Sequence, residues 1–87
     1  MVSPLNVLIL GTGAIGTYIG ASLLKSGQNA VFLERPEWKD ALLQSGIQLT
    51  QATGVYKATD PVIVSSIAEA LENGPFDAAV AAVKSFD

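Results

Sequence analysis

An apolar run near the start of the chain ends directly in three closely spaced glycines. Residues 5–10 read Leu-Asn-Val-Leu-Ile-Leu, and Gly11, Gly13 and Gly16 follow at the spacing G-x-G-x-x-G. A near-continuous apolar run of this length is typical of a buried parallel strand. The residues after the turn have the apolar spacing of a helix over 14–26. This strand–turn–helix order is the one that binds the pyrophosphate of a dinucleotide, and it requires an α/β fold with a parallel sheet.

Each glycine has its own role in that prediction. Gly11 permits a tight turn, Gly13 lets the backbone approach the phosphates, and Gly16 lets the helix pack closely on the strand. The start of the helix then directs N–H groups and the positive end of its dipole at the anion. A tight turn in a domain that binds no ligand remains an alternative. The predicted cofactor-binding residues of the turn are Gly11, Thr12, Gly13, Ala14, Ile15 and Gly16.

Strands and helices are expected to alternate along the remaining chain. Strands are predicted over 29–34, 47–52 and 78–83, helices over 37–45 and 66–73, with a possible hairpin arm over 55–59 and an extended piece over 61–64. The fold class is therefore a Rossmann-type, doubly wound, mostly parallel sheet, with 47–52 as its third strand and the spatial order 3-2-1-4. Such a fold usually needs about 150 residues. Residues 1–87 are thus expected to be a partial N-terminal dinucleotide-binding domain, truncated before its later strands.

Two later positions would complete a dinucleotide site. Glu34 and Arg35 stand side by side at the end of the second predicted strand. An acid there accepts hydrogen bonds from the adenosine ribose and favours NAD, whereas an arginine grips the 2′-phosphate of NADP. Lys84 ends the strand predicted beside the first one, so it should lie across the same crevice. Plain surface charges remain the alternative for all three residues.

Several other residues are expected to be structural. Gly16 and Gly20 lie four residues apart on one stripe of the first helix, which suggests that this helix lies very close to the sheet. Ser65 and Ser66 supply an N-cap for the last helix. Asp77 should mark a turn, and Tyr18 should pack against the protein. The residues of the second helix expected to face inward are Trp38, Ala41, Leu42 and Leu43, with Trp38 in the core or under a lid rather than against an adenine.

Composition excludes several classes of function. The net charge is −3, and the five Lys and Arg residues are scattered, so the chain has no nucleic-acid footprint. Cysteine and histidine are absent, which excludes disulfides, thiol and imidazole catalysis and zinc ligation within this sequence, and no metal site is expected. No apolar run approaches the roughly 20 residues of a membrane span, and the N-terminal run lacks the features of a signal peptide. A cytoplasmic location is expected.

The sequence resembles the N-terminal part of the ketopantoate reductase (2-dehydropantoate 2-reductase) family. Three segments carry the resemblance: residues 9–16 with the Ala-Ile pair in the glycine turn, residues 31–36 with Arg35, and residues 74–77 leading to 83–87 with Lys84. It implies NADPH reduction of a 2-keto acid, with ketopantoate reduced to pantoate for pantothenate biosynthesis. By position, Arg35 would bind the 2′-phosphate, and Lys84 would lie near the nicotinamide end. Glu34 departs from the pattern and leaves NAD possible.

The resemblance also sets what this sequence should lack. In the family, the proton-donating lysine and its supporting residues lie further along, mostly in a helical C-terminal domain, so no catalytic residue is expected here and this piece alone should be inactive. The expected partner is a small 2-keto acid, with a homodimer left open. Three other functions remain: a non-catalytic dinucleotide-sensing module, a related NAD-dependent 2-hydroxy acid dehydrogenase, and a structural domain without a ligand.

Overall fold

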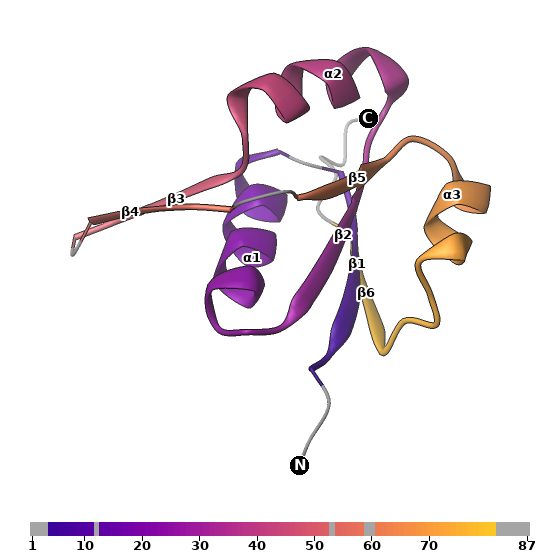
Figure 1. The fold of residues 1–87 in the computed structure, drawn as a ribbon, viewed down its shortest axis with the longest axis horizontal. Coiled ribbons are helices and arrows are strands. Elements are labelled where there is room, and N and C mark those ends of the chain that lie inside the picture. The colour runs from indigo at the N-terminus through magenta and orange to yellow at the C-terminus, as the bar shows by residue number, and fades with distance from the viewer. Residues whose placement is uncertain (1–3, 12, 53, 59–60, 82–87) are drawn as a thin grey trace, which may run out of the picture.

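A parallel sheet with helices on both faces forms the centre of the molecule (Figure 1). This computed structural model describes residues 4–11, 13–52, 54–58 and 61–81, so the predicted site residues Thr12 and Lys84 lie outside the described residues. The Rossmann-type α/β class is confirmed. The elements are β1 Asn6–Leu10, α1 Ala14–Lys25, β2 Asn29–Leu33, α2 Pro36–Ser45, β3 Gln48–Gln51, β4 Gly54–Lys57, β5 Val62–Val64, α3 Ile67–Glu72 and β6 Ala78–Ala81.

The main sheet has the strand order β5-β2-β1-β6 within the described residues, and all its pairings are parallel. β1 pairs with β2 from Asn6–Asn29 to Leu10–Leu33, and β6 pairs with β1 on the other side, with Ala81 opposite Leu10. The carboxyl ends of β1, β2 and β6 therefore lie at one edge. The predicted position of the last strand beside the first, with the second strand on the other side, is confirmed, and the order reverses between β1 and β6.

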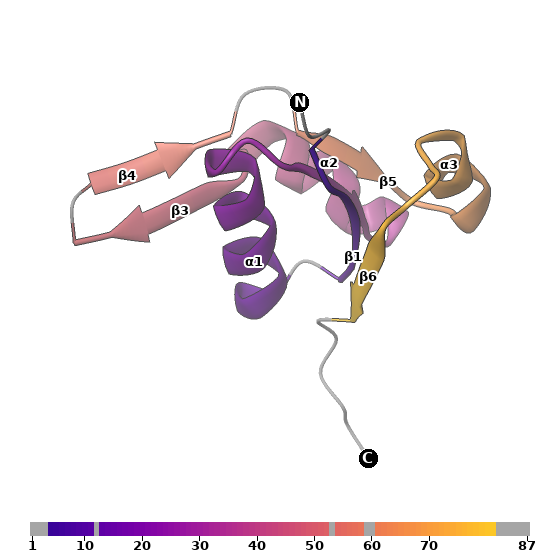
Figure 2. The ribbon, with the colours of Figure 1, turned by 90° about the horizontal axis from the view of Figure 1, so that it is seen from below.

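The prediction for the third strand of the parallel sheet was wrong. Residues 48–51 form a strand, but this strand, β3, pairs antiparallel with β4 in a separate hairpin. The hairpin extends away from the sheet on the side of α1 (Figure 2). The third parallel strand is β5, in which three residues pair with β2. Ile47 and Leu49 are buried with residues of α1, so their alternating pattern reflects burial under the helix and not membership of the sheet.

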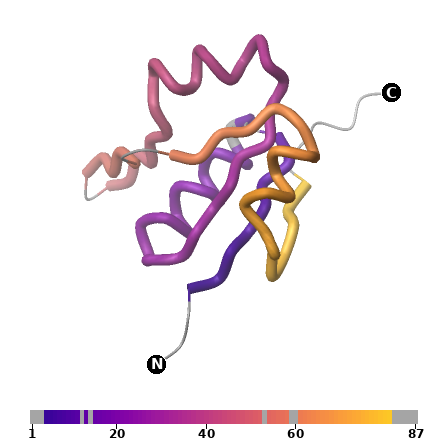
Figure 3. Tube along the Cα trace, turned by 45° about the vertical axis from the view of Figure 1, so that its right-hand side comes forward, coloured from indigo at the N-terminus to yellow at the C-terminus, as the bar shows by residue number. Residues whose placement is uncertain are grey.

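The sheet has an apolar core on each face. The larger core contains side chains of the sheet, α1 and the hairpin, and its largest fully buried side chains are Phe32, Ile9 and Ile47. On the opposite face, Ala70 of α3 packs with Val31 and Val64. The trace in Figure 3 shows α1 on one side of the sheet strands and α3, the connection between β5 and β6, on the other.

Glycine brings α1 against β2. Gly20 is buried, and a Cβ placed on it would lie less than 3.0 Å from the Phe32 ring carbons Cε1 and Cζ. Neighbouring Ala21 is fully buried in the same core. The close approach predicted from the two glycines is therefore confirmed at Gly20. The helix ends as predicted, with Ser26 as C-cap and Gly27 at φ 91°.

Several predictions of burial were wrong. β1 is not buried on both sides, because Leu8 and Leu10 are only half-buried on the face that α3 covers in part. Tyr18 is exposed on α1. In α2, no residue is buried: Trp38 and Leu43 are exposed and Ala41 is exposed with them, while Leu42 alone of the predicted set packs partly on the core.

No helix in the described part of the chain is long and apolar enough to cross a membrane.

We expect Gly20→Ala to lower the free energy of unfolding by about 1–3 kcal/mol, the usual cost of overpacking a core. A loss of stability would be evidence for the close contact, because alanine in a helix is otherwise favoured over glycine by about 1 kcal/mol. Chemical denaturation measures the change. In a Phe32→Leu background the smaller side chain makes room for the methyl group, so the same substitution should cost less there. A stabilising Gly20→Ala would show that α1 does not lie this close to β2.

Candidate functional site

The glycine turn continues β1 and then opens α1. Gly11 has φ 92°, in the left-handed region that favours glycine, and its N–H donates to the Leu33 carbonyl oxygen (3.0 Å). Gly13 is the N-cap of α1, and its carbonyl accepts the first helical hydrogen bond from Thr17 (2.9 Å). Among the described residues no side chain caps this helix, and its first turn carries no acidic residue. The helix N-terminus is thus compatible with an anionic ligand.

The end of β2 brings Glu34 and Arg35 to the same edge of the sheet. The Glu34 N–H donates to the Val64 carbonyl oxygen (2.9 Å), which ties this segment to β5. The Glu34 carboxylate accepts from the Arg35 N–H through Oε1 (2.9 Å). Arg35 is extended and exposed, and it serves as the N-cap of α2, in which Pro36 occupies the first position. Proline cannot extend β2 and is preorganised for the helix, so the sequence itself fixes where the strand stops.

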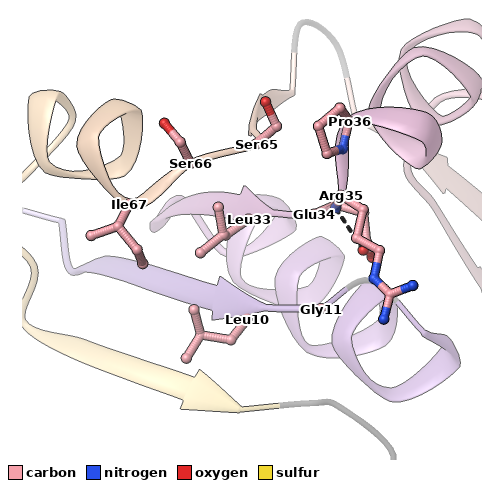
Figure 4. Close-up of a pocket in the computed structure, with 9 residues that line it drawn as sticks. All are labelled: Leu10, Gly11, Leu33, Glu34, Arg35, Pro36, Ser65, Ser66 and Ile67. Carbon is pink, nitrogen blue, oxygen red and sulfur yellow. Dashed lines mark hydrogen bonds between the residues drawn. The ribbon is translucent and has the colours of Figure 1, made fainter.

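These segments line a shallow, open pocket of about 380 Å³. A volume of this size lies within the range of about 300–1,000 Å³ that is usual for ligand pockets. Figure 4 shows Leu10 and Gly11 along one side, Ser65, Ser66 and Ile67 along the other, and Arg35 at one end. The pocket is lined by Leu10, Gly11, Leu33, Glu34, Arg35, Pro36, Ser65, Ser66 and Ile67.

The pocket brings together three of the predicted site residues, Gly11, Glu34 and Arg35. Gly13 lines a neighbouring pocket of about 370 Å³ with Glu34 and Trp38, so Glu34 faces both. Of the remaining turn residues, Gly16 is buried and Ile15 is 69% exposed, and only the helical backbone of Ala14 is described. Their cofactor-binding role stays a prediction. Asp77, by contrast, accepts from the Asn6 N–H (2.8 Å) at the opposite end of β1.

Sequence reasoning missed the wall formed by Ser65, Ser66 and Ile67. The two serines were expected only to cap α3, and Ser66 does so, because its Oγ accepts from the Glu69 N–H (3.1 Å). Their place in the pocket follows from β5, since they come directly after the strand that lies beside β2. The sequence does contain a pattern that predicts this wall, the apolar residues Val62–Val64 followed by two serines. It was not used because residues 47–52 had been assigned as the third strand of the sheet.

Glu69 holds this wall in place. Its Oε1 accepts from the Ser65 N–H (3.2 Å), the Ser65 hydroxyl (3.1 Å) and the Ser66 hydroxyl (3.4 Å). Its Oε2 lies 3.6 Å from Nζ of Lys39 on α2. The hydrogen bonds from Ser65, first from its backbone and then from its hydroxyl, lower the pKa of Glu69 below its ordinary value of 4.5, and Lys39 adds to the effect. Serine followed three residues later by glutamate is the capping-box pattern, here with the carboxylate reaching back to Ser65.

The sheet order, the glycine turn and the pocket at the carboxyl ends of the strands define a Rossmann-type domain with a candidate dinucleotide site. Residues 7–87 match the family model described as Ketopantoate reductase PanE/ApbA. The chain therefore belongs to this family, which consists of oxidoreductases that bind a nicotinamide dinucleotide, and the resemblance seen in the sequence is confirmed. No match was found among curated proteins or among solved structures.

The lowered pKa of Glu69 leads to a pH-dependent prediction. A carboxyl whose pKa is lower in the folded state stabilises the fold fully above its unfolded pKa, and the contribution is lost as the pH falls through the folded pKa. The stability difference between the wild type and Glu69→Gln should therefore be largest well above pH 4.5 and shrink below it. Urea denaturation at a series of pH values measures this difference. Glu72→Gln, on the exposed end of the same helix, controls for the removal of one charge, and a difference for Glu69→Gln that stays constant into acid would contradict the prediction.

Proposed function

We propose that this chain is the NADPH-binding part of a 2-keto acid reductase, with 2-dehydropantoate as the substrate. One observation carries the proposal: Gly11, which opens the glycine turn, and the Glu34–Arg35 pair, more than 20 residues further along the sequence, line one pocket at the carboxyl ends of β1 and β2. In open α/β sheets, ligands bind at this edge. Membership of the ketopantoate reductase family supports the choice of reaction.

The residues present fit a dinucleotide in three respects. The positive φ of Gly11 and the missing Cβ of Gly13 leave room for a pyrophosphate to approach the backbone at the start of α1. Leu10, Leu33 and Ile67 supply apolar surface of the kind that an adenine ring needs. Arg35 is exposed at the end of the pocket, where its planar guanidinium can grip a 2′-phosphate with two hydrogen bonds.

In this proposal the chain positions the cofactor and does not supply the acid that protonates the product. The turn holds the pyrophosphate, so that the nicotinamide extends toward the switch point between β1 and β6. When bound, the reduced nicotinamide supplies the hydride for the keto carbon of the substrate. Protonation of the resulting alkoxide is assigned to residues outside this sequence, in keeping with the division of labour that the family resemblance implies.

We expect Arg35→Ala to weaken NADPH binding by about 1.5–3 kcal/mol and to leave NADH binding nearly unchanged, because the lost contact is a charge-assisted one to the 2′-phosphate. Calorimetric titration of both cofactors measures the two losses. Lys57→Ala removes one positive charge on the hairpin and controls for the change in net charge. Equal losses for NADPH and NADH would show that Arg35 does not read the 2′-phosphate and would assign the discrimination to Glu34.

The assignment of the acid outside this sequence is tested by turnover. The 87-residue chain, mixed with NADPH and 2-dehydropantoate, should bind the cofactor and oxidise none of it above the rate without protein. Absorbance of the reduced nicotinamide follows the reaction directly. Turnover by this chain alone would overturn the division between a cofactor-binding part and a catalytic part, whereas absence of binding to either NADPH or NADH would overturn the proposed function itself.

A further inference from the structure

Glu69 connects the two helices that border the proposed adenosine pocket. One of its carboxylate oxygens accepts hydrogen bonds from Ser65 and Ser66, which belong to the wall of the pocket nearest α3. The other lies 3.6 Å from Nζ of Lys39, one turn along α2 from Arg35. A single side chain thus contacts both the Ser65–Ser66 turn and the helix that carries the arginine.

Two sets of contacts fix the position of this wall: Ala70 of α3 packs on Val31 and Val64, and Glu69 binds the Ser65–Ser66 turn. β5, which leads into it, consists of three residues, and the hydrogen bond from the Glu34 N–H to the Val64 carbonyl ends one residue before Ser65. Beyond that point the chain turns into α3, and Glu69 is the side chain that binds the turn. An ion pair with side chains 27% and 43% exposed contributes little to stability. The hydrogen bonds from Ser65 and Ser66 to Glu69 order the turn, and the ion pair connects this ordered turn to α2.

We propose that Glu69 is a positioning residue for the adenosine end of the bound dinucleotide. By holding the Ser65–Ser66 turn and Lys39 together, it sets the distance between the Ser65–Ile67 side of the pocket and Arg35 at its end. The inference rests on the proposed function, because it assumes that this pocket receives the adenosine half. Glu69 itself does not touch the ligand in this proposal, and it acts through the two serines and Lys39.

The sign of the effect separates positioning from simple electrostatics. The adenosine end of NADPH carries phosphate charges, so removing a nearby negative charge should strengthen binding if only Coulomb repulsion mattered. Loss of a positioning contact should weaken binding, because the pocket must then be ordered when the ligand binds. Glu69→Gln has nearly the same shape as the wild type and removes the charge, so the two explanations predict opposite results for one variant.

The experiment is calorimetric titration of 2′,5′-ADP, which carries only the adenosine half, and of NADPH. Glu69→Gln should bind both about three- to tenfold more weakly than the wild type, the effect of losing one ordering interaction, and by the same factor for each. Glu72→Gln removes the same charge from the exposed end of α3 and should bind no more weakly than the wild type. Unchanged or tighter binding by Glu69→Gln would overturn the proposal.

Variants of Lys39 test the same link from the other helix. Lys39→Arg keeps a cation for the Glu69 carboxylate and should retain wild-type affinity, whereas Lys39→Gln should lose affinity for both ligands. If Glu69→Gln does not fold, this pair alone decides: equal affinities for Lys39→Gln and Lys39→Arg would overturn the proposal. A loss for NADPH much larger than for 2′,5′-ADP would also overturn it, because the effect would not lie at the adenosine end. Failure of the wild type to bind either ligand would instead refute the proposed function.

Discussion

The contact between Gly20 and Phe32 determines where α1 lies on the sheet. The aromatic ring is fully buried, and it occupies the space that a side chain at position 20 would need. Because the helix backbone rests on the ring, the axis of α1 comes close to β2, and Ala21 is buried beside it. A helix is a rigid rod, so a contact near its middle also places its first turn. The position of the anion-binding end, at Gly13, thus depends on packing two turns further along.

The first third of the fold could be predicted because local and tertiary preferences agree there. An apolar run, a glycine turn and a C-cap glycine each indicate the element that the structure contains, and Gly11 and Gly27 both have the positive φ that glycine allows. The third strand could not be predicted in this way. The alternation of Ile47 and Leu49 indicates a strand with one buried face, but it does not say which partner buries it. That choice is made by α1, which covers both side chains.

The identity of the third strand also determines which residues line the candidate site. Once β5 lies beside β2, the residues after β5 necessarily face the residues after β2, so Ser65 and Ser66 stand opposite Arg35. The pair Glu34–Arg35 could be predicted, since its distance from the glycine turn is a property of the sequence. The opposite wall could not, because it depends on which strand joins the sheet.

The exposed face of helix α2 could not be predicted from the sequence either. Its apolar spacing suggests an inner face, yet Trp38 is 54% exposed, because the helix lies at the edge of the sheet and not upon it.

The charges around the pocket impose a further condition on any anionic ligand. The Glu34 carboxylate accepts from the backbone N–H of Arg35, and Glu69 Oε2 lies 3.6 Å from Lys39 Nζ, so within the described residues each of these two cationic residues contacts a carboxylate. The whole chain carries a net charge of −3. Long-range attraction therefore contributes little to capturing a dinucleotide phosphate, and screening removes what remains beyond about 8 Å at physiological salt. Affinity must come from short contacts: the backbone at the start of α1, the guanidinium of Arg35 and a pocket already held at the right width. For a site with this charge balance, the positions of its walls matter more than the number of its cations.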